Sequence, residues 1–174
     1  PRWVLQPLAN GEPVHVKPAA SPTEKIYISF KLGDAGVRKA GNWGQNQYLQ
    51  LTLSDTVNPG DVGAKLFSGY IVRLFLDNAS NVTIDCIARD NSRLVGNSIF
   101  AINFGSATMP YADVVGGTIQ LVIQSNNTVS VALDDTIIAE RQNLIPSDIA
   151  EDLMVSLFHM SQAGGEGEWH IDDF

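Results

Sequence analysis

The sequence predicts an all-β fold in which two antiparallel sheets pack face to face. Apolar and polar side chains alternate with a period of two from one end of the chain to the other, whereas helical periodicity is nearly absent. Residues that favour turns separate these short alternating segments. Because ten or more short strands cannot lie in one open twisted sheet without curling, we expect a β-sandwich.

Length and composition limit the classes of protein to consider. The chain has 174 residues, of which 44% are hydrophobic and 17% charged, so we expect one folded domain over residues 1–174. A net charge of -8 without a basic stripe argues against nucleic acid as a partner. No apolar run approaches twenty residues, which argues against a membrane span. Since no charged and apolar leader follows Pro1, we expect an excised or mature domain.

The strands can be placed in order along the chain. Residues 7–22 hold four prolines and are expected to form an irregular or edge approach. The segments KIYISFKL (25–32) and QYLQLTL (47–53) alternate cleanly, as strands packed on one face do. Further strands are expected at 70–76, 82–89, 98–104, 118–124, 128–133, 136–141 and 153–159. The predicted core consists of Ile26, Ile28, Phe30, Leu49, Leu51, Leu53, Val72, Leu74, Leu121, Ile123, Val129, Val131, Val155 and Leu157.

The connections between these strands are expected to be mostly hairpin turns. Asn, Asp, Gly and Ser cluster at 58–61, 77–78, 90–92, 116–117, 125–127 and 134–135. One helical turn is expected in IPSDIAEDL (145–153), where Ser147 can cap the first residues. A chain of this length exceeds an immunoglobulin-type domain of roughly 100 residues and suits a jelly roll.

The single cysteine, Cys86, excludes an internal disulfide and a cysteine-rich zinc site. Its segment NVTIDCIARD alternates in the manner of a strand, with Val82, Ile84, Cys86 and Ala88 on one face. We therefore expect Cys86 to be a small buried apolar side chain rather than a reactive thiol.

Two segments resemble a known group of proteins. The hairpin Thr118 to Arg141 contains VSVALDD-TIIAE, a strand that ends in an Asp turn and returns as a short apolar strand, and the chain closes on WHIDDF. With these features, residues 43–174 resemble the concanavalin A-like superfamily of lectin, laminin G-like and carbohydrate-binding domains. The resemblance implies a two-sheet jelly roll, often calcium-bound, that binds glycans more often than it cleaves them.

The closing stretch GGEGEWHIDDF holds a candidate metal site. If Trp169 and Ile171 face the core, Asp173 has the same inward register, where a carboxylate must be paired, hydrogen-bonded or bound to a cation. We expect Asp173, with Asp172 or a backbone carbonyl, to hold a structural calcium ion where the last strand pairs near the first. The alternative is a strand-end aspartate that accepts hydrogen bonds from a loop.

Sugar sites combine exposed aromatic rings with polar side chains, and GNWGQNQY (41–48) supplies both. Within it, Trp43, Asn46 and Tyr48 are candidate ligand-binding residues, although Trp43 could instead cover the edge of the core. Tyr27 is a further candidate, because it shares a polar strand face with Lys25, Ser29 and Lys31.

Arg73 is the last candidate ligand-binding residue. It interrupts the apolar strand YIVRLFLD, so it would need a carboxylate or a ligand if its face is covered, and Asp85 is one possible partner.

These observations favour a noncatalytic module that binds a glycan or polysaccharide, as part of a larger secreted or cell-surface protein. One alternative is a glycoside hydrolase or polysaccharide lyase that uses Glu166 and Glu168, which would share a strand face. Another is a laminin G-like adhesion domain that binds proteins through loops or a sheet edge. His159 and His170 lack a partner histidine at metal spacing, so we expect them to be structural.

Overall fold

The computed structural model describes residues 2–5, 15–18, 26–38, 47–54, 68–77, 81–95, 98–124, 128–142, 154–161 and 168–174. Strands account for almost all of this part of the chain. In chain order the elements are β1 (Arg2–Leu5), β2 (His15–Pro18), β3 (Ile26–Arg38), β4 (Gln47–Ser54), β5 (Gly69–Leu76), β6 (Asn81–Val95), β7 (Ser98–Pro110), the 3-10 helix η1 (Tyr111–Asp113), β8 (Thr118–Ile123), β9 (Thr128–Leu133), β10 (Thr136–Gln142), β11 (Met154–Ser161) and β12 (Glu168–Asp172).

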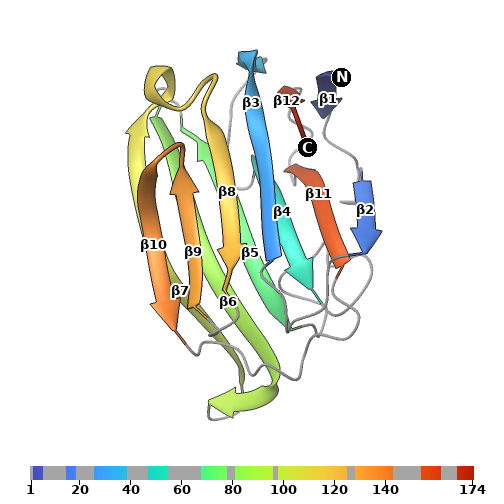
Figure 1. Ribbon diagram of the computed structural model, residues 1–174, viewed down its shortest axis with the longest axis vertical. Coiled ribbons are helices and arrows are strands. Elements are labelled where there is room, and N and C mark those ends of the chain that lie inside the picture. Colours follow the sequence, from blue (N-terminus) through green and yellow to red (C-terminus); the bar gives the residue numbers. More distant parts are fainter. Residues whose placement is uncertain are drawn as a thin grey trace.

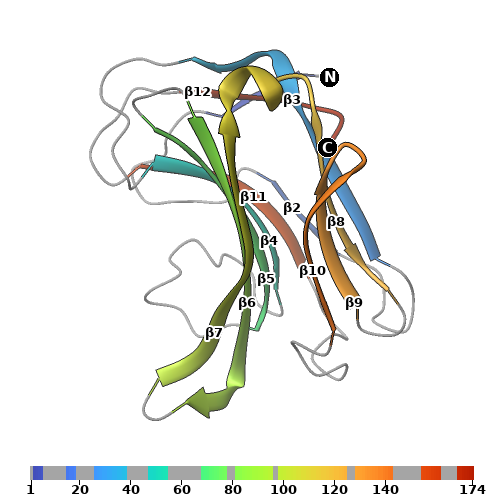
Figure 2. The same ribbon diagram turned by 90° about the vertical axis from the view of Figure 1, so that its left-hand side faces the viewer.

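The strands form two six-stranded antiparallel sheets that pack face to face, which confirms the predicted β-sandwich (Figures 1 and 2). Sheet A has the order β1-β12-β3-β8-β9-β10, and sheet B has the order β2-β11-β4-β5-β6-β7. β1 and β2 are therefore edge strands, one in each sheet. The last strand pairs with the first, since Trp3 lies opposite Ile171 and Leu5 opposite Trp169.

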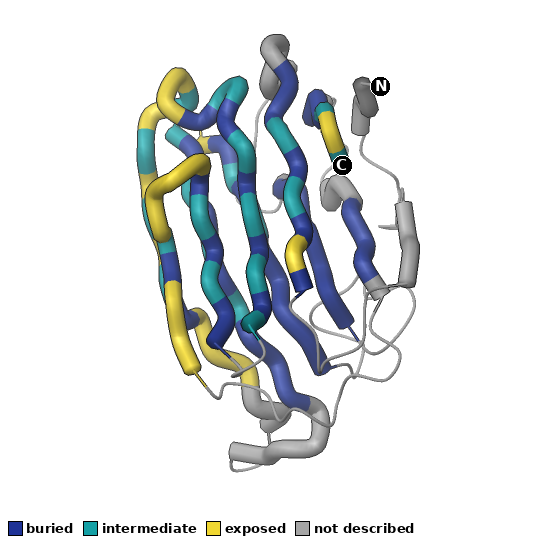
Figure 3. The backbone as a smooth tube through the Cα atoms, in the orientation of Figure 1, coloured by how far each residue is buried: buried dark blue, intermediate teal, exposed yellow. Residues whose placement is uncertain are grey.

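The core lies between the sheets, and buried and less buried residues alternate along strands such as β6, β8 and β9 (Figure 3). In β4, the described residues are buried on both faces. All fourteen residues predicted for the core are buried. Among the residues whose burial is described, Trp169 and Phe30, both 0% exposed, are the largest wholly buried side chains. Burying a side chain of this kind stabilises the fold by about 1.5–3 kcal/mol. Cys86 is buried in the core as well, as the sequence predicted.

At the side opposite β1 and β2, the two sheets end in β10 and β7. These two strands contact each other and close that side of the sandwich. Gly105 of β7 allows this approach. A methyl group at Gly105 would overlap the Cβ of Ala139 on β10 and lie 3.1 Å from its Cα. An irregularity in the pairing of β6 and β7 follows Cys86, and Phe104 is buried in the core beside it.

The turn between β9 and β10 forms at Asp134 and Asp135, as predicted, with Asp134 in a left-handed backbone conformation at φ 51°. Its carboxylate Oδ1 accepts a hydrogen bond from the Thr118 amide at 2.9 Å. The sequence did not predict η1, which follows Pro110 and precedes the buried Val114. The helical turn expected at 145–153 lies outside the described residues. In the ranges that the structure describes, no helix could cross a membrane.

Candidate functional site

The outer face of sheet B, opposite the core, carries a row of polar side chains across four strands. Gln50 of β4, Arg73 of β5, Asp85 of β6 and Ser106 of β7 lie directly opposite one another. Alternation explains their direction: Leu74 next to Arg73 is in the core, so Arg73 faces outward. We call these four residues the polar row.

A second row lies beside the polar row on the same face. Tyr48, Phe75, Thr83 and Thr108 are opposite one another on the same four strands. The rings of Tyr48 and Phe75 meet edge to face, with 5.3 Å between centroids and 64° between planes. We call them the aromatic pair. The hydroxyls of Thr83 and Thr108 are hydrogen-bonded at 2.8 Å.

Three contacts hold the guanidinium of Arg73 in place. Its Nε donates a hydrogen bond to Oε1 of Gln50 at 3.2 Å. Its Cζ lies 4.5 Å from the centroid of the Tyr48 ring and 5.7 Å from that of Phe75, within the range of cation–π attraction. The guanidinium therefore leans toward β4. Within the described part of the chain, no hydrogen bond uses its two terminal nitrogens, Nη1 and Nη2.

Gln50 is the buried support of this arrangement. Its side chain is 0% exposed, and its Nε2 donates a hydrogen bond to the Thr52 hydroxyl at 2.9 Å. Thr52 is also wholly buried. Ser156 of β11 lies opposite Thr52 and is buried, and its hydroxyl has no hydrogen-bond partner among the described residues.

Asp85 makes its side-chain hydrogen bonds to β7, on the side away from Arg73 and β4. Its Oδ1 accepts hydrogen bonds from the Ser106 hydroxyl at 2.7 Å and from Asn103 Nδ2 at 3.3 Å, both on β7. Although Arg73 lies opposite Asp85 in the register, its hydrogen bond goes to Gln50 on β4 instead. The charge of Asp85 also affects Cys86, the next residue in β6. Burial is the larger cause and the Asp85 charge the smaller one, and together they raise the pKa of the Cys86 thiol to about 12.

Exposure increases across this face from β4 to β7. Gln50 is enclosed, Arg73 and Asp85 are half-buried, and Ser106 is exposed. In their middle part, β6 and β7 bend toward sheet A (Figure 2). The partly exposed side of this face lies over β5, β6 and β7.

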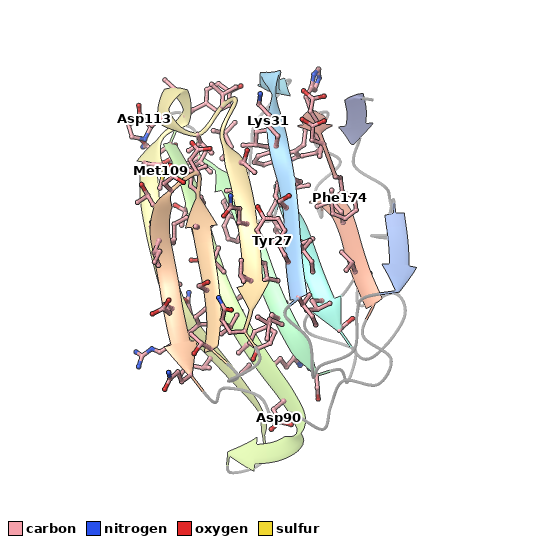
Figure 4. The ribbon with its side chains drawn as sticks, in the orientation of Figure 1. Tyr27, Lys31, Asp90, Met109, Asp113 and Phe174 are labelled. Carbon is pink, nitrogen blue, oxygen red and sulfur yellow. The ribbon has the colours of Figure 1, made fainter. Side chains whose placement is uncertain are left out.

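The structure brings together two of the residues that the sequence proposed for ligand binding. Tyr48 and Arg73 are in contact on sheet B. Tyr27 is 56% exposed, but it projects from β3 of the other sheet and shares no site with them (Figure 4). Trp43 and Asn46 lie outside the described residues.

The other members of this face were not predicted from the sequence. Gln50 and Ser106 belong to the polar row, and Asn103 supplies a donor to Asp85. Their signal in the sequence is modest: Gln50 follows Tyr48 by two positions on the polar side of an alternating strand. Such a pattern marks a face of a strand without showing which other strands lie beside it.

The proposed calcium ligands lie at the end of β12. Trp169 and Ile171 face the core as expected, but the inward register predicted for Asp173 is wrong. Asp173 is exposed, because the strand ends at Asp172 and the next residue has a left-handed φ of 53°. Asp172 lies opposite Lys31.

No group of three or more metal-binding side chains lies together within the described residues. A calcium ion held by Asp172 and Asp173 thus stays a proposal. The prediction assumed that the Asp173 carboxylate is buried, and it is exposed.

The carboxylates of the enzymatic alternative lie elsewhere. Glu168 begins β12 in sheet A, and Glu166 is outside the described residues. His170 on the same strand is buried. On the polar row itself, Asp85 is the one carboxylate, whereas a retaining glycosidase uses two carboxyl groups about 5 Å apart.

No family model matches the chain, and no curated protein matches it. Several solved structures are similar to it. The carbohydrate recognition domain of Emp47p aligns with a TM-score of 0.61 at 12% identity, over 98% of this chain and 84% of that one. A legume lectin-like domain from Entamoeba histolytica aligns with a TM-score of 0.58 at 10% identity, over 98% of this chain and 86% of that one.

LamAcat from Zobellia galactanivorans aligns with a TM-score of 0.50 at 13% identity, over 91% of this chain and 63% of that one. The likeness thus extends to lectin domains and to other members of the same fold, at identities that bear on the fold alone. These similarities agree with the sheet topology and confirm the predicted resemblance: the chain has the concanavalin A-like fold.

Proposed function

We propose that this domain is a noncatalytic glycan-binding module of a larger secreted or cell-surface protein, and that the glycan binds over the polar row. The fold supports this proposal in part, because a lectin-like domain and an alginate lyase share it. The observation that carries it is the polar row itself, which lies beside an aromatic pair and retains unused hydrogen-bonding groups.

Those groups suit a saccharide. Arg73 offers the donors Nη1 and Nη2, and Asp85 offers Oδ2, which accepts none of the hydrogen bonds made by the described residues. A sugar hydroxyl can donate to the carboxylate and accept from the guanidinium. The half-buried ring of Phe75 lies next to Arg73 and can pack against the C–H groups of a sugar ring.

A glycan array followed by calorimetric titration of each hit tests the proposal. Asp85→Asn keeps an acceptor for Ser106 but removes the charge, and it should weaken binding about tenfold or more. Glu140→Gln is the matched control, because it removes a carboxylate from an exposed position on β10 of the other sheet. It should leave the affinity unchanged.

A reducing-sugar assay and an ultraviolet assay for unsaturated products should be run on every glycan that binds. Binding without turnover supports the module, whereas turnover would identify a hydrolase or a lyase. If no glycan binds, or if Asp85→Asn and Glu140→Gln bind as the wild type does, the polar row is not a glycan site. A protein-binding domain of laminin G type would then be the better account.

A further inference from the structure

We propose that the glycan is acidic, and that Arg73 binds a carboxylate of a uronic acid residue. This inference rests on the proposed function and names the class of saccharide that the polar row selects.

The guanidinium of Arg73 is held in one orientation. The hydrogen bond from Nε to Gln50 and the stacking over Tyr48 leave one edge of the planar guanidinium, with Nη1 and Nη2, unused by the described residues. That edge presents two parallel donors, which match the two oxygens of a carboxylate. Because the guanidinium is already held in place, little side-chain freedom is lost when a ligand binds.

The polar row holds one positive charge, on Arg73, and one negative charge, on Asp85. Arg73 is half-buried, and among the described residues its side-chain hydrogen bond goes to an uncharged amide. The neighbouring carboxylate, Asp85, directs its bonded oxygen to Ser106 and Asn103 on β7. A partly desolvated cation favours an anionic partner over a neutral one. A ligand carboxylate would be that partner.

Asp85 then determines how the sugar is oriented. Its negative charge would repel a carboxylate placed over β6, whereas its free Oδ2 can accept hydrogen bonds from hydroxyl groups. The ligand would therefore place its carboxylate over Arg73 on β5 and its hydroxyls toward β6 and β7. A neutral sugar would satisfy Asp85 but offer no carboxylate to Nη1 and Nη2 of Arg73, which no described residue binds.

The test uses short acidic oligosaccharides and their own neutral derivatives. Trisaccharides of mannuronate, galacturonate and glucuronate are each compared with the same trisaccharide after reduction of its carboxyl groups to primary alcohols. Short ligands limit the long-range repulsion that a polyanion would meet at a domain of net charge -8. Affinities are measured by calorimetry with the whole chain.

The wild type should bind at least one acidic trisaccharide about tenfold to a hundredfold more tightly than its reduced form. Arg73→Lys keeps the charge but removes the planar pair of donors, so it should lower this ratio. Arg73→Met should abolish the preference. Lys31→Met removes one positive charge from the outer face of the other sheet and should leave the ratio unchanged.

The outcomes separate this inference from the proposed function. If acidic and reduced trisaccharides bind equally well, the inference is overturned while the glycan module stands. If no acidic or neutral saccharide binds, both are overturned. The comparison of ligands on the wild type needs no substitution, so it decides the question even if an Arg73 variant fails to fold.

Discussion

Replacing Gln50 by methionine tests whether the buried amide supports the polar row. Gln50→Met keeps an unbranched side chain of similar length but removes both hydrogen bonds of the amide. The Thr52 hydroxyl, which is wholly buried, loses its donor, and Nε of Arg73 loses its acceptor.

The expected loss of stability follows from these two bonds. A buried group left without its partner costs about 1–3 kcal/mol, and the half-buried Arg73 can recover part of its loss from water. We therefore expect the free energy of unfolding to fall by about 2–3 kcal/mol. For a domain of this size, each kcal/mol lowers Tm by about 2–4 °C.

Urea denaturation followed by tryptophan fluorescence measures this change, because Trp169 is buried in the core and becomes exposed on unfolding. Gln120→Met is the matched control: Gln120 is half-buried on the outer face of β8 in the other sheet. Its effect should stay within about 0.5 kcal/mol.

Two results would refute the reasoning. One is a Gln50→Met variant that unfolds at the same urea concentration as the wild type. The other is an absence of coupling with Thr52→Val. Removing both partners of a buried hydrogen bond is less unfavourable than removing one, so the double variant should lose less stability than the two single losses predict when added.

Three further predictions concern the closed edge, pH and calcium. Gly105→Ala should destabilise the domain by about 1–3 kcal/mol through overpacking, and Ala139→Gly in the same chain should restore part of that loss in urea denaturation. Burial raises the pKa of Tyr70 from 10.0 to about 12, and that of Cys86 from 9.0 to about 12, the latter with a smaller contribution from Asp85. The Tyr70 hydroxyl and the Cys86 thiol are harder to ionise in the folded state than in the unfolded state. Their contribution to the free energy of unfolding is therefore complete below pH 9 and declines as the pH rises toward 12. Urea denaturation at each pH should show a smaller decline for Tyr70→Phe than for the wild type. If calcium binds at Asp173, adding it should raise Tm and a chelator should lower it, whereas an unchanged Tm and no metal by elemental analysis would exclude the site.

The core was predictable because the face to which a strand residue points follows a local rule. In β4, the alternation of Leu49, Leu51 and Leu53 with polar residues determines which side chains face inward, whatever strand lies alongside. The same rule failed at Asp173, where the backbone turns left-handed and the strand ends. Alternation holds only while the chain stays extended, and the turn-favouring pair Asp172-Asp173 was interpreted as part of the strand.

The site was harder to predict because it combines strands that are distant in the sequence. Arg73 and Asp85 were linked correctly as neighbours, since they lie on the two strands that flank the turn predicted at 77–78. Ser106 could not be linked to Asp85 in the same way, because the register between β6 and β7 shifts after Cys86. A shift of one residue changes the face and the partner of every side chain beyond it.

The two faces of sheet B are also coupled mechanically. Val72 and Leu74 are buried in the core on either side of Arg73, so their packing fixes the backbone from which the guanidinium extends. Closely packed interiors transmit small displacements, and an error of 1 Å is large for a bidentate contact. If an acidic glycan binds at Arg73 as proposed, a cavity made at Leu74 should weaken that binding although Leu74 touches no ligand. An equal cavity at Leu121 in the other sheet should lower stability and leave the geometry of Arg73 unchanged, because β8 contributes no residue to the polar row.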